Sequence, residues 1–285
     1  MSRTPYMKDG KYLVGKVRAV NDLKISIEES VELIGGFAKV INEGDTVTIK
    51  PNLNTADPCP ACSDSEFIRA LGEAIYDAGA SKLKITDSST MMATTSDVAQ
   101  KAGISAIADD LDAELVFLDE HPWVKTKFPR GKYLKSGSIG APLKDRGKLV
   151  LAPCLKTHFL ARFTASMKLF VGWIRHRERI RMHTRKLEEK IADLASFFEP
   201  DLIVMDARRC FVTGGPSSGD VEEPGLILAS GDMVSIDVTG VRILQSFGAK
   251  NKLNMNVWDL PQIRHAVDLE VGAKSDDEIL VVESE

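Results

Sequence analysis

Two cysteines separated by two residues form the most chemically specific motif in this sequence. Cys59 and Cys62 are spaced so that both sulfurs can reach one metal ion or each other. Cys154 and Cys210 lie far along the chain, but each comes after a predicted strand. If all four cysteines converge, their thiolates suit zinc or an iron–sulfur cluster. The alternatives are a redox-active pair of Cys59 and Cys62 alone, or four thiols without a chemical role.

Basic and polar side chains follow the same predicted strands. Lys50 and Lys156 end buried strands, so their ammonium groups should meet an anion there. That anion is either a carboxylate, such as Asp87 or Asp206, or a bound ligand. His158 could be a metal ligand, a general base, a phosphate contact or a structural histidine. The catalytic candidates are Lys156, His158, Lys168 and Asp87, and the candidate cofactor-binding residues are Lys50, Asn52, Ser88, His183, Gly215 and Ser218.

Two further segments could bind an anion. Residues 175–186 hold six Arg or Lys, two His and one Glu, so they could contact a phosphorylated molecule, dock a partner or form a solvated basic face. Residues 213–219 form a glycine-rich turn whose backbone could approach a ligand, or a plain loop. The turn lacks the P-loop ending and the dinucleotide-binding spacing. Nucleophile-elbow, HExxH and kinase motifs are also missing from the sequence.

Short apolar runs alternate with amphipathic segments along the chain. The predicted strands are Tyr12–Val20, Thr46–Lys50, Lys82–Thr86, Leu115–Phe117, Leu149–Ala152, Leu202–Met205, Leu226–Ala229 and Glu278–Val282. Capping boxes at Ser26 with Glu29 and at Ser63 with Glu66 predict two helix starts. Further helices are predicted over 96–101, 186–198 and 232–247.

This alternation predicts the α/β class, with a mostly parallel sheet covered by helices on both faces. Ligands of such sheets bind beyond the carboxyl ends of the strands, where the cysteines and basic residues fall. The 285 residues are expected to form a single domain. Residues 119–147 interrupt the rhythm with prolines and glycines, which predicts an irregular insertion, either a hairpin or a lid.

Composition narrows the function classes. With 44% hydrophobic and 27% charged residues the chain has a globular profile, and its net charge of −4 offers nucleic acid no general attraction. The longest apolar runs are too short to span a bilayer, and the polar first ten residues lack the core of a secretory signal. We therefore expect a cytoplasmic protein with reduced or metal-bound cysteines.

Taken in order, the motifs resemble those of the family named domain of unknown function 362. The matching pieces are residues 47–53, Asp87-Ser88, 153–158, 164–168, His183, 201–207, 215–219 and 229–232 with Asp237. The resemblance implies an α/β fold. It also implies iron–sulfur or redox contexts, since many relatives are fused to ferredoxin-like modules. It implies no particular reaction.

Three functional hypotheses follow. The leading one is a metal- or iron–sulfur-binding protein with a redox or enzyme-accessory role, whose ligands are Cys59, Cys62, Cys154 and Cys210. The second is a cluster-free enzyme or binding protein for a phosphorylated or carboxylated small molecule. The third is a non-catalytic subunit that docks a partner through residues 175–186. The expected partners are a small anionic molecule or a redox protein, without nucleic acid or membrane, and self-association into a homo-oligomer is left open.

Overall fold

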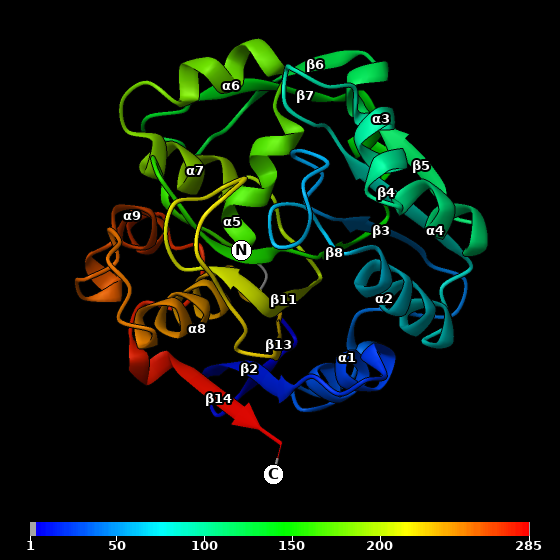
Figure 1. The fold of residues 1–285 in the computed structure, drawn as a ribbon, viewed down its shortest axis with the longest axis horizontal. Helices are drawn as coiled ribbons and strands as arrows, with labels where there is room; N and C mark the ends of the chain where they lie inside the picture. The colour runs from blue at the N-terminus through cyan, green and yellow to red at the C-terminus, as the bar shows by residue number, and fades with distance from the viewer. Residues whose placement is uncertain (1–3, 285) are drawn as a thin grey trace.

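The computed structural model describes residues 4–284 and is built around one large sheet (Figure 1). The order of its main strands is β1-β2-β13-β11-β8-β3-β4-β5. These strands are β1 (Met7–Lys8), β2 (Lys11–Arg18), β3 (Thr46–Lys50), β4 (Lys82–Asp87), β5 (Glu114–Phe117), β8 (Lys148–Leu151), β11 (Leu202–Phe211) and β13 (Leu226–Ser230). The additional strands are β9 (Cys154–His158), β10 (Arg162–Thr164), β12 (Val221–Glu222) and β14 (Ile279–Glu283).

Parallel pairing runs through the half of the sheet that carries the predicted site. β11, β8, β3, β4 and β5 are parallel to their neighbours in that order. β13 is antiparallel to both β11 and β2, and β14 runs parallel to β2 at the other end. The carboxyl ends of β3, β4 and β8 therefore open at one edge of the sheet.

Helices cover both faces of this sheet (Figure 1). They are α1 (Leu23–Glu32), α2 (Ser65–Asp77), α3 (Thr95–Lys101), α4 (Ile104–Asp110), α5 (Ser166–Leu169), α6 (His176–Met182), α7 (Leu187–Ala195), α8 (Met233–Ser246) and α9 (Pro261–Asp268). Successive side chains of a strand point to opposite faces. Val150 accordingly joins the core under α1 and α2, while Leu149 and Leu151 join the core under α7 and α8. The predicted α/β class and the two covered faces are confirmed.

Each of the eight predicted strands is present, with ends shifted by a residue or two, apart from β11, which extends to Phe211. Residues 154–158 form a further buried strand, β9, beyond the end of the predicted strand Leu149–Ala152, and Lys156 lies in its middle rather than at a strand end. β9 pairs with β10 and β11. Pro153 and the polar residues interrupt the apolar run, so the sequence pattern ends the predicted strand at Ala152.

Both predicted capping boxes are wrong about the capping residue. Asp22 caps α1 by accepting hydrogen bonds from the backbone of Lys24 and Ile25, whereas Ser26 lies within the helix. Asp64 caps α2, and the hydroxyl of Ser63 instead accepts a hydrogen bond from the backbone of Asn52. In each case a nearby aspartate supplies the cap.

The insertion over 119–147 contains an antiparallel hairpin of β6 (Trp123–Lys127) and β7 (Ser136–Gly140), separate from the large sheet. Ile139 bridges to Ile174, and Glu178 of α6 accepts hydrogen bonds from the backbone and hydroxyl of Ser138. The hairpin is therefore anchored on α6. A lid role for it stays a prediction. Across residues 4–284, no helix is both long and apolar enough to cross a membrane.

Candidate functional site

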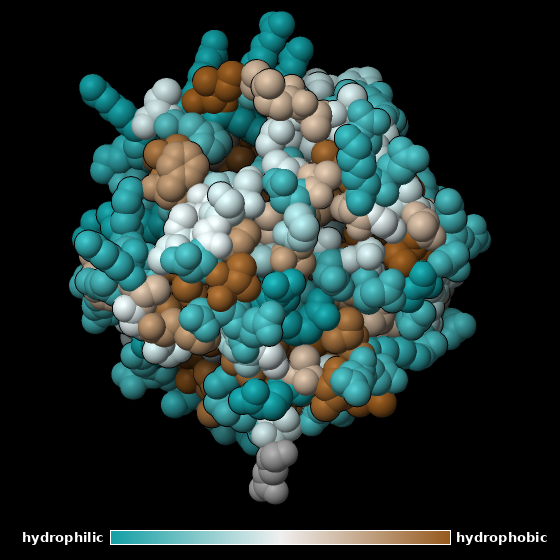
Figure 2. Space-filling view, in the orientation of Figure 1, coloured by the Kyte–Doolittle hydropathy of each residue, from teal (hydrophilic) through white to brown (hydrophobic). Residues whose placement is uncertain are grey.

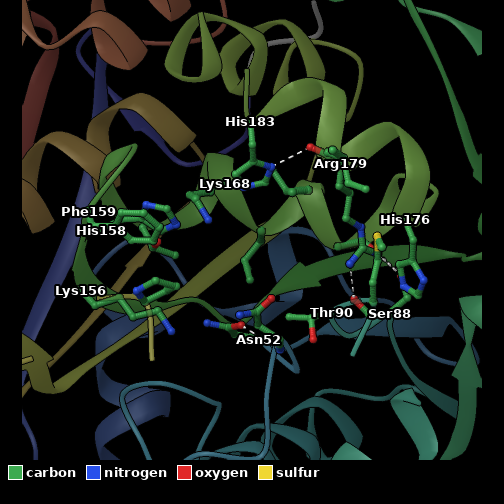
Figure 3. A pocket seen from close by; sticks show the side chains of 18 residues that line it. Asn52, Ser88, Thr90, Lys156, His158, Phe159, Lys168, His176, Arg179 and His183 are labelled. Carbon is green, nitrogen blue, oxygen red and sulfur yellow. Dashed lines mark hydrogen bonds between the residues drawn. The ribbon is translucent and has the colours of Figure 1, made fainter. Parts of the chain in front are cut away.

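A cavity of about 410 Å³ opens where the carboxyl ends of β3 and β4 meet α5 and α6 (Figure 3). A hollow is visible beside α6 in the space-filling view, with hydrophobic surface at its edge (Figure 2). The polar and charged residues that line the cavity are Asn52, Asn54, Ser88, Thr90, Lys156, His158, Thr164, Lys168, His176, Arg179 and His183. Its position is the one that the strand order predicts for a ligand site.

The lining is basic. Three cationic residues and three histidines line the cavity, and none of the lining residues is an aspartate or glutamate. Uncompensated positive charge in a partly buried cavity attracts anions. The cavity is therefore complementary to a negatively charged ligand.

Lys168 is the cation with the greatest freedom to bind. It lies on α5, whose first residues are held by Asp237: the carboxylate accepts hydrogen bonds from the backbone of Ser166 and Met167 and from the Ser166 hydroxyl. Within residues 4–284, the Lys168 ammonium has no hydrogen bond or ion pair, although the side chain is largely buried. Burial lowers its pKa to about 7, and the positive charges of Lys156 and Arg179 contribute.

His158 presents a hydrogen-bond donor to the cavity. Its Nδ1 accepts hydrogen bonds from the backbone N–H groups of Leu160, at 3.1 Å, and Ala161, at 3.0 Å. An imidazole nitrogen that accepts two N–H donors carries no proton, so in the neutral ring the proton is on Nε2. Burial lowers the pKa of His158 to about 2, with Lys168 as the next cause, which keeps the ring neutral. His158 is thus arranged as a donor rather than as a base.

His183 has the opposite tautomer. Its Nδ1 lies 2.7 Å from the carbonyl oxygen of Arg179, and a carbonyl can only accept. Nδ1 therefore carries the proton, and Nε2 of the neutral ring keeps a free lone pair. Burial lowers the pKa of His183. In Figure 3, Lys168 lies between His158 and His183.

Arg179 shapes the cavity instead of offering donors to it. Its guanidinium donates to the carbonyls of Ile174, Gly172, Ser88 and Ser89 and to the Ser88 hydroxyl. All its N–H groups have partners, and the side chain is buried. Burial lowers its pKa to about 10, so it is still charged at neutral pH. It contributes positive potential and fixes the loop after β4.

The Lys156 ammonium also has hydrogen-bond partners within the protein. Its ammonium donates to the carbonyls of Pro60 at 2.8 Å and Ala61 at 2.6 Å, within the loop between Cys59 and Cys62. Burial lowers its pKa. Lys156 therefore lines the cavity while tying the cysteine loop to β9.

Lys50 and Asp87 form the carboxylate alternative that the sequence left open. Their buried ion pair has an N–O distance of 2.7 Å, and neither residue lines the cavity. Asp87 also accepts hydrogen bonds from the backbone of Leu53 and Ser88. The pair thus holds together the two loops that supply Asn52 and Ser88 to the cavity.

Two lining residues have buried polar atoms without a hydrogen-bond partner among the described residues. They are the hydroxyl of Thr164 and Nε2 of His176. Leaving a buried polar group unpaired costs roughly 1–3 kcal/mol. Such atoms in a cavity wall are candidates for pairing with a ligand.

The glycine-rich turn contributes packing and one lining residue, Pro216. Gly215 has a positive φ of 69°, and an added Cβ would lie 1.9 Å from the carbonyl oxygen of Thr157. Close approach of the turn to β9 therefore requires glycine here. Ser218 is exposed outside the cavity, and its carbonyl accepts a hydrogen bond from the backbone of Gly215.

The cysteines gather behind the cavity, around Cys154. The sulfur of Cys154 lies 3.8 Å from the Ser63 hydroxyl and 3.5 Å from the carbonyl oxygen of Cys62. A hydrogen bond from Cys59 is the main cause that lowers the pKa of Cys154. The same bond and burial raise the pKa of Cys59.

Burial raises the pKa of Cys62 to about 12 and also raises that of Cys210. The thiolate is the metal-binding form of cysteine, so ligation by these residues would require the loss of their thiol protons. Among the described residues, no group of three or more His, Cys, Asp or Glu side chains is arranged to hold a metal ion. As arranged here, the cysteines do not make a ligand set, and the metal site stays a prediction.

The structure brings six of the nominated residues into one cavity: Lys156, His158, Lys168, Asn52, Ser88 and His183. The basic segment 175–186 contributes four residues to the cavity lining, namely His176, Arg179, Ile180 and His183, whereas only His183 was among the candidate site residues. Their spacing of three, four and seven residues places them on one helical face, a signal that the sequence contained. The exposed Arg177, Arg181 and Arg185 point elsewhere, and partner docking by them stays a prediction.

The fold and the cavity together define a mixed α/β protein with a basic cavity at the carboxyl edge of its parallel strands. The chain belongs to the family described as domain of unknown function (DUF362), whose model matches residues 47–242. That match includes every residue that lines the cavity. The chain is also similar to the thylakoid-associated protein sll1697 of Synechocystis sp. (strain ATCC 27184 / PCC 6803 / Kazusa), at 24% identity over 255 residues, which are 82% of this chain and 76% of the relative.

Proposed function

We propose that this protein binds a small organic anion, phosphorylated or carboxylated, in the cavity beside Lys168, as an enzyme or as a binding protein. One observation carries the proposal. Among the described residues, the Lys168 ammonium has no partner, in a cavity whose lining contains no carboxylate. A cation with no internal counterion is best stabilised by an anion from outside.

Neighbouring donors support the same ligand. His158 offers an N–H from Nε2, since Nδ1 is occupied by backbone donors, and the Thr164 hydroxyl has no partner among the described residues. Together with Lys168 they provide an ammonium, an N–H and an O–H, a set that suits phosphate or carboxylate oxygens.

The cavity also holds the groups that proton transfer requires. His183 keeps a free Nε2 lone pair that can accept a proton, because its Nδ1 donates to the Arg179 carbonyl. Lys168 has a pKa of about 7, so it can donate or accept a proton near neutral pH. This pairing supports the enzyme form of the proposal and assigns the acid–base roles to Lys168 and His183 rather than to His158.

Isothermal titration calorimetry with inorganic phosphate and with acetate tests the proposal. Lys168→Met should weaken binding by about tenfold or more, since a hydrogen bond to a charged group contributes roughly 1.5–3 kcal/mol. Lys101→Met is the matched control, because Lys101 is exposed on α3 outside the cavity. Cys59→Ser should leave anion binding intact. If neither these anions nor organic phosphates or carboxylates bind, or if Lys168→Met binds like the wild type, the proposal is wrong.

The iron–sulfur or zinc hypothesis remains a separate proposal, motivated by the gathering of cysteines around Cys154. Anaerobic purification followed by metal analysis and visible absorption would test it. A colourless, metal-free protein with four titratable thiols would contradict it.

Cytoplasmic location also stays part of the proposal. The name of the Synechocystis relative places that protein with thylakoids, which is a different setting. Fractionation of cells that express this chain, with detection in the cytosolic and membrane fractions, would decide between them.

A further inference from the structure

The mouth of the cavity is built from exposed apolar side chains. Phe159 is 56% exposed, Ile180 is 55% exposed and Met91 is 53% exposed, and all three line the cavity. They come from three separate segments, namely the turn after β9, helix α6 and the loop after β4. Large apolar side chains that gather at the edge of a hollow mark a binding surface. Figure 2 shows hydrophobic surface at this edge.

Phe159 supplies a flat wall at the mouth. Its ring stacks on the imidazole of His158, with the ring centres 5.3 Å apart and the planes 7° from parallel (Figure 3). The imidazole is itself held by the backbone of Leu160 and Ala161. The aromatic surface is thus oriented by the same histidine that presents a donor to the cavity.

The cavity therefore has two chemically different ends. Lys168, His158 and Thr164 are polar and largely buried, while Phe159 and Ile180 are apolar and exposed. Its volume of about 410 Å³ lies within the range of roughly 300–1,000 Å³ that is typical of cavities for drug-sized ligands. A bare phosphate or carboxylate would fill only a small part of that space.

We infer that the ligand is an amphiphilic organic anion: a phosphate or carboxylate bonded to an aryl or alkyl group. The anionic group contacts Lys168 and His158, and the apolar group packs against Phe159 and Ile180. This inference rests on the proposed function, because it presupposes that the cavity binds an anion.

Paired probes in calorimetry test it. Phenyl phosphate should bind about ten- to a hundredfold more tightly than inorganic phosphate, because the ring leaves water. Phenylacetate should exceed acetate by a similar factor. The two pairs also show whether phosphate or carboxylate is the preferred anionic group.

Phe159→Ala should reduce phenyl phosphate affinity by about fivefold or more and leave inorganic phosphate affinity within about twofold. Met255→Ala is the control, since Met255 is 40% exposed outside the cavity. If neither phosphate binds, the proposed function fails together with this inference. If inorganic phosphate binds but the phenyl group adds nothing, only the inference is overturned.

Sedimentation with phosphatidylglycerol vesicles gives a further outcome. Vesicle binding that depends on Phe159, without any preference for phenyl phosphate, would assign the apolar mouth to a membrane surface and overturn the inference. Absence of vesicle binding together with a preference for phenyl phosphate would support it.

Discussion

Lys168, His158 and His183 acquire different chemical roles from the groups that surround them. Backbone N–H groups occupy Nδ1 of His158 and leave it a donor, while a backbone carbonyl occupies Nδ1 of His183 and leaves it an acceptor. Lys168 lacks any partner among the described residues, so its protonation depends on burial and on nearby charge. Residue type alone could not distinguish these roles, because a histidine's tautomer follows from its contacts.

The pKa of Lys168 predicts how anion binding depends on pH. Its amine is charged below about pH 7 and neutral above it, so sulfate affinity should fall as pH rises from about 6 to about 8. Sulfate is the appropriate probe because its own charge is constant over this range. Binding should also raise the pKa of Lys168, and calorimetry in buffers of different ionisation enthalpy would detect the accompanying proton uptake.

Lys168→Met is the control for this pH dependence, since its side chain does not titrate. The pKa of His158 is lowered to about 2, so its ring does not titrate in this range, and burial lowers the pKa values of His176 and His183 as well. A pH profile that is unchanged in Lys168→Met would assign the titration to another group.

At the scale of elements, α6 is the main organiser of the cavity. One face of this short helix and its cap presents His176, Arg179, Ile180 and His183 to the cavity. Arg179 connects the helix to the loop after β4 through Ser88 and Ser89. The helix therefore positions lining residues from the strands as well as its own.

Arg179→Lys should destabilise the fold by roughly 2–4 kcal/mol, because an ammonium cannot supply the planar set of donors that five acceptors receive from the guanidinium. Urea unfolding followed by circular dichroism measures the loss. Arg181→Lys, on the exposed face of the same helix, should change stability by less than about 0.5 kcal/mol. Equal effects of the two substitutions would contradict the role given to Arg179.

At the scale of the whole molecule, the cavity depends on segments that meet only in the folded chain. Its lining comes from the loops after β3 and β4, from β9 and β10, from α5, α6 and the turn between them, and from the glycine-rich turn at Pro216. The Lys50–Asp87 pair and the Gly215 contact with Thr157 join these segments.

Gly215→Ala should destabilise the protein and weaken anion binding, because the added Cβ would meet the Thr157 carbonyl and displace the turn that carries Pro216. Gly248→Ala is the matched control. Gly248 has a similar positive φ of 62°, but an added Cβ would meet nothing within 4 Å. The control should lose only about 1 kcal/mol to backbone strain, and the Gly215 variant clearly more, as measured by thermal unfolding.

The sequence by itself determined the α/β class, seven of the eight main strands together with β14, and the edge of the sheet at which the candidate ligand-binding residues gather. These features follow from local patterns, since apolar runs of strand length and polar residues at strand ends are visible without knowledge of long-range contacts. The buried strand β9 was not predicted, because its sequence is not an apolar run. It forms a strand through its pairing with β10 and β11, which local patterns do not reveal.

Only the tertiary structure decided which nominated residues share the cavity and what each can do there. It paired Lys50 with Asp87, directed Lys156 to the carbonyls of the cysteine loop and left Lys168 without a partner among the described residues. Such outcomes depend on distances between segments far apart in the sequence. The physical reason is that the pKa and the hydrogen bonds of a buried charged group depend on the groups within a few ångströms of it. The tertiary fold determines which groups those are.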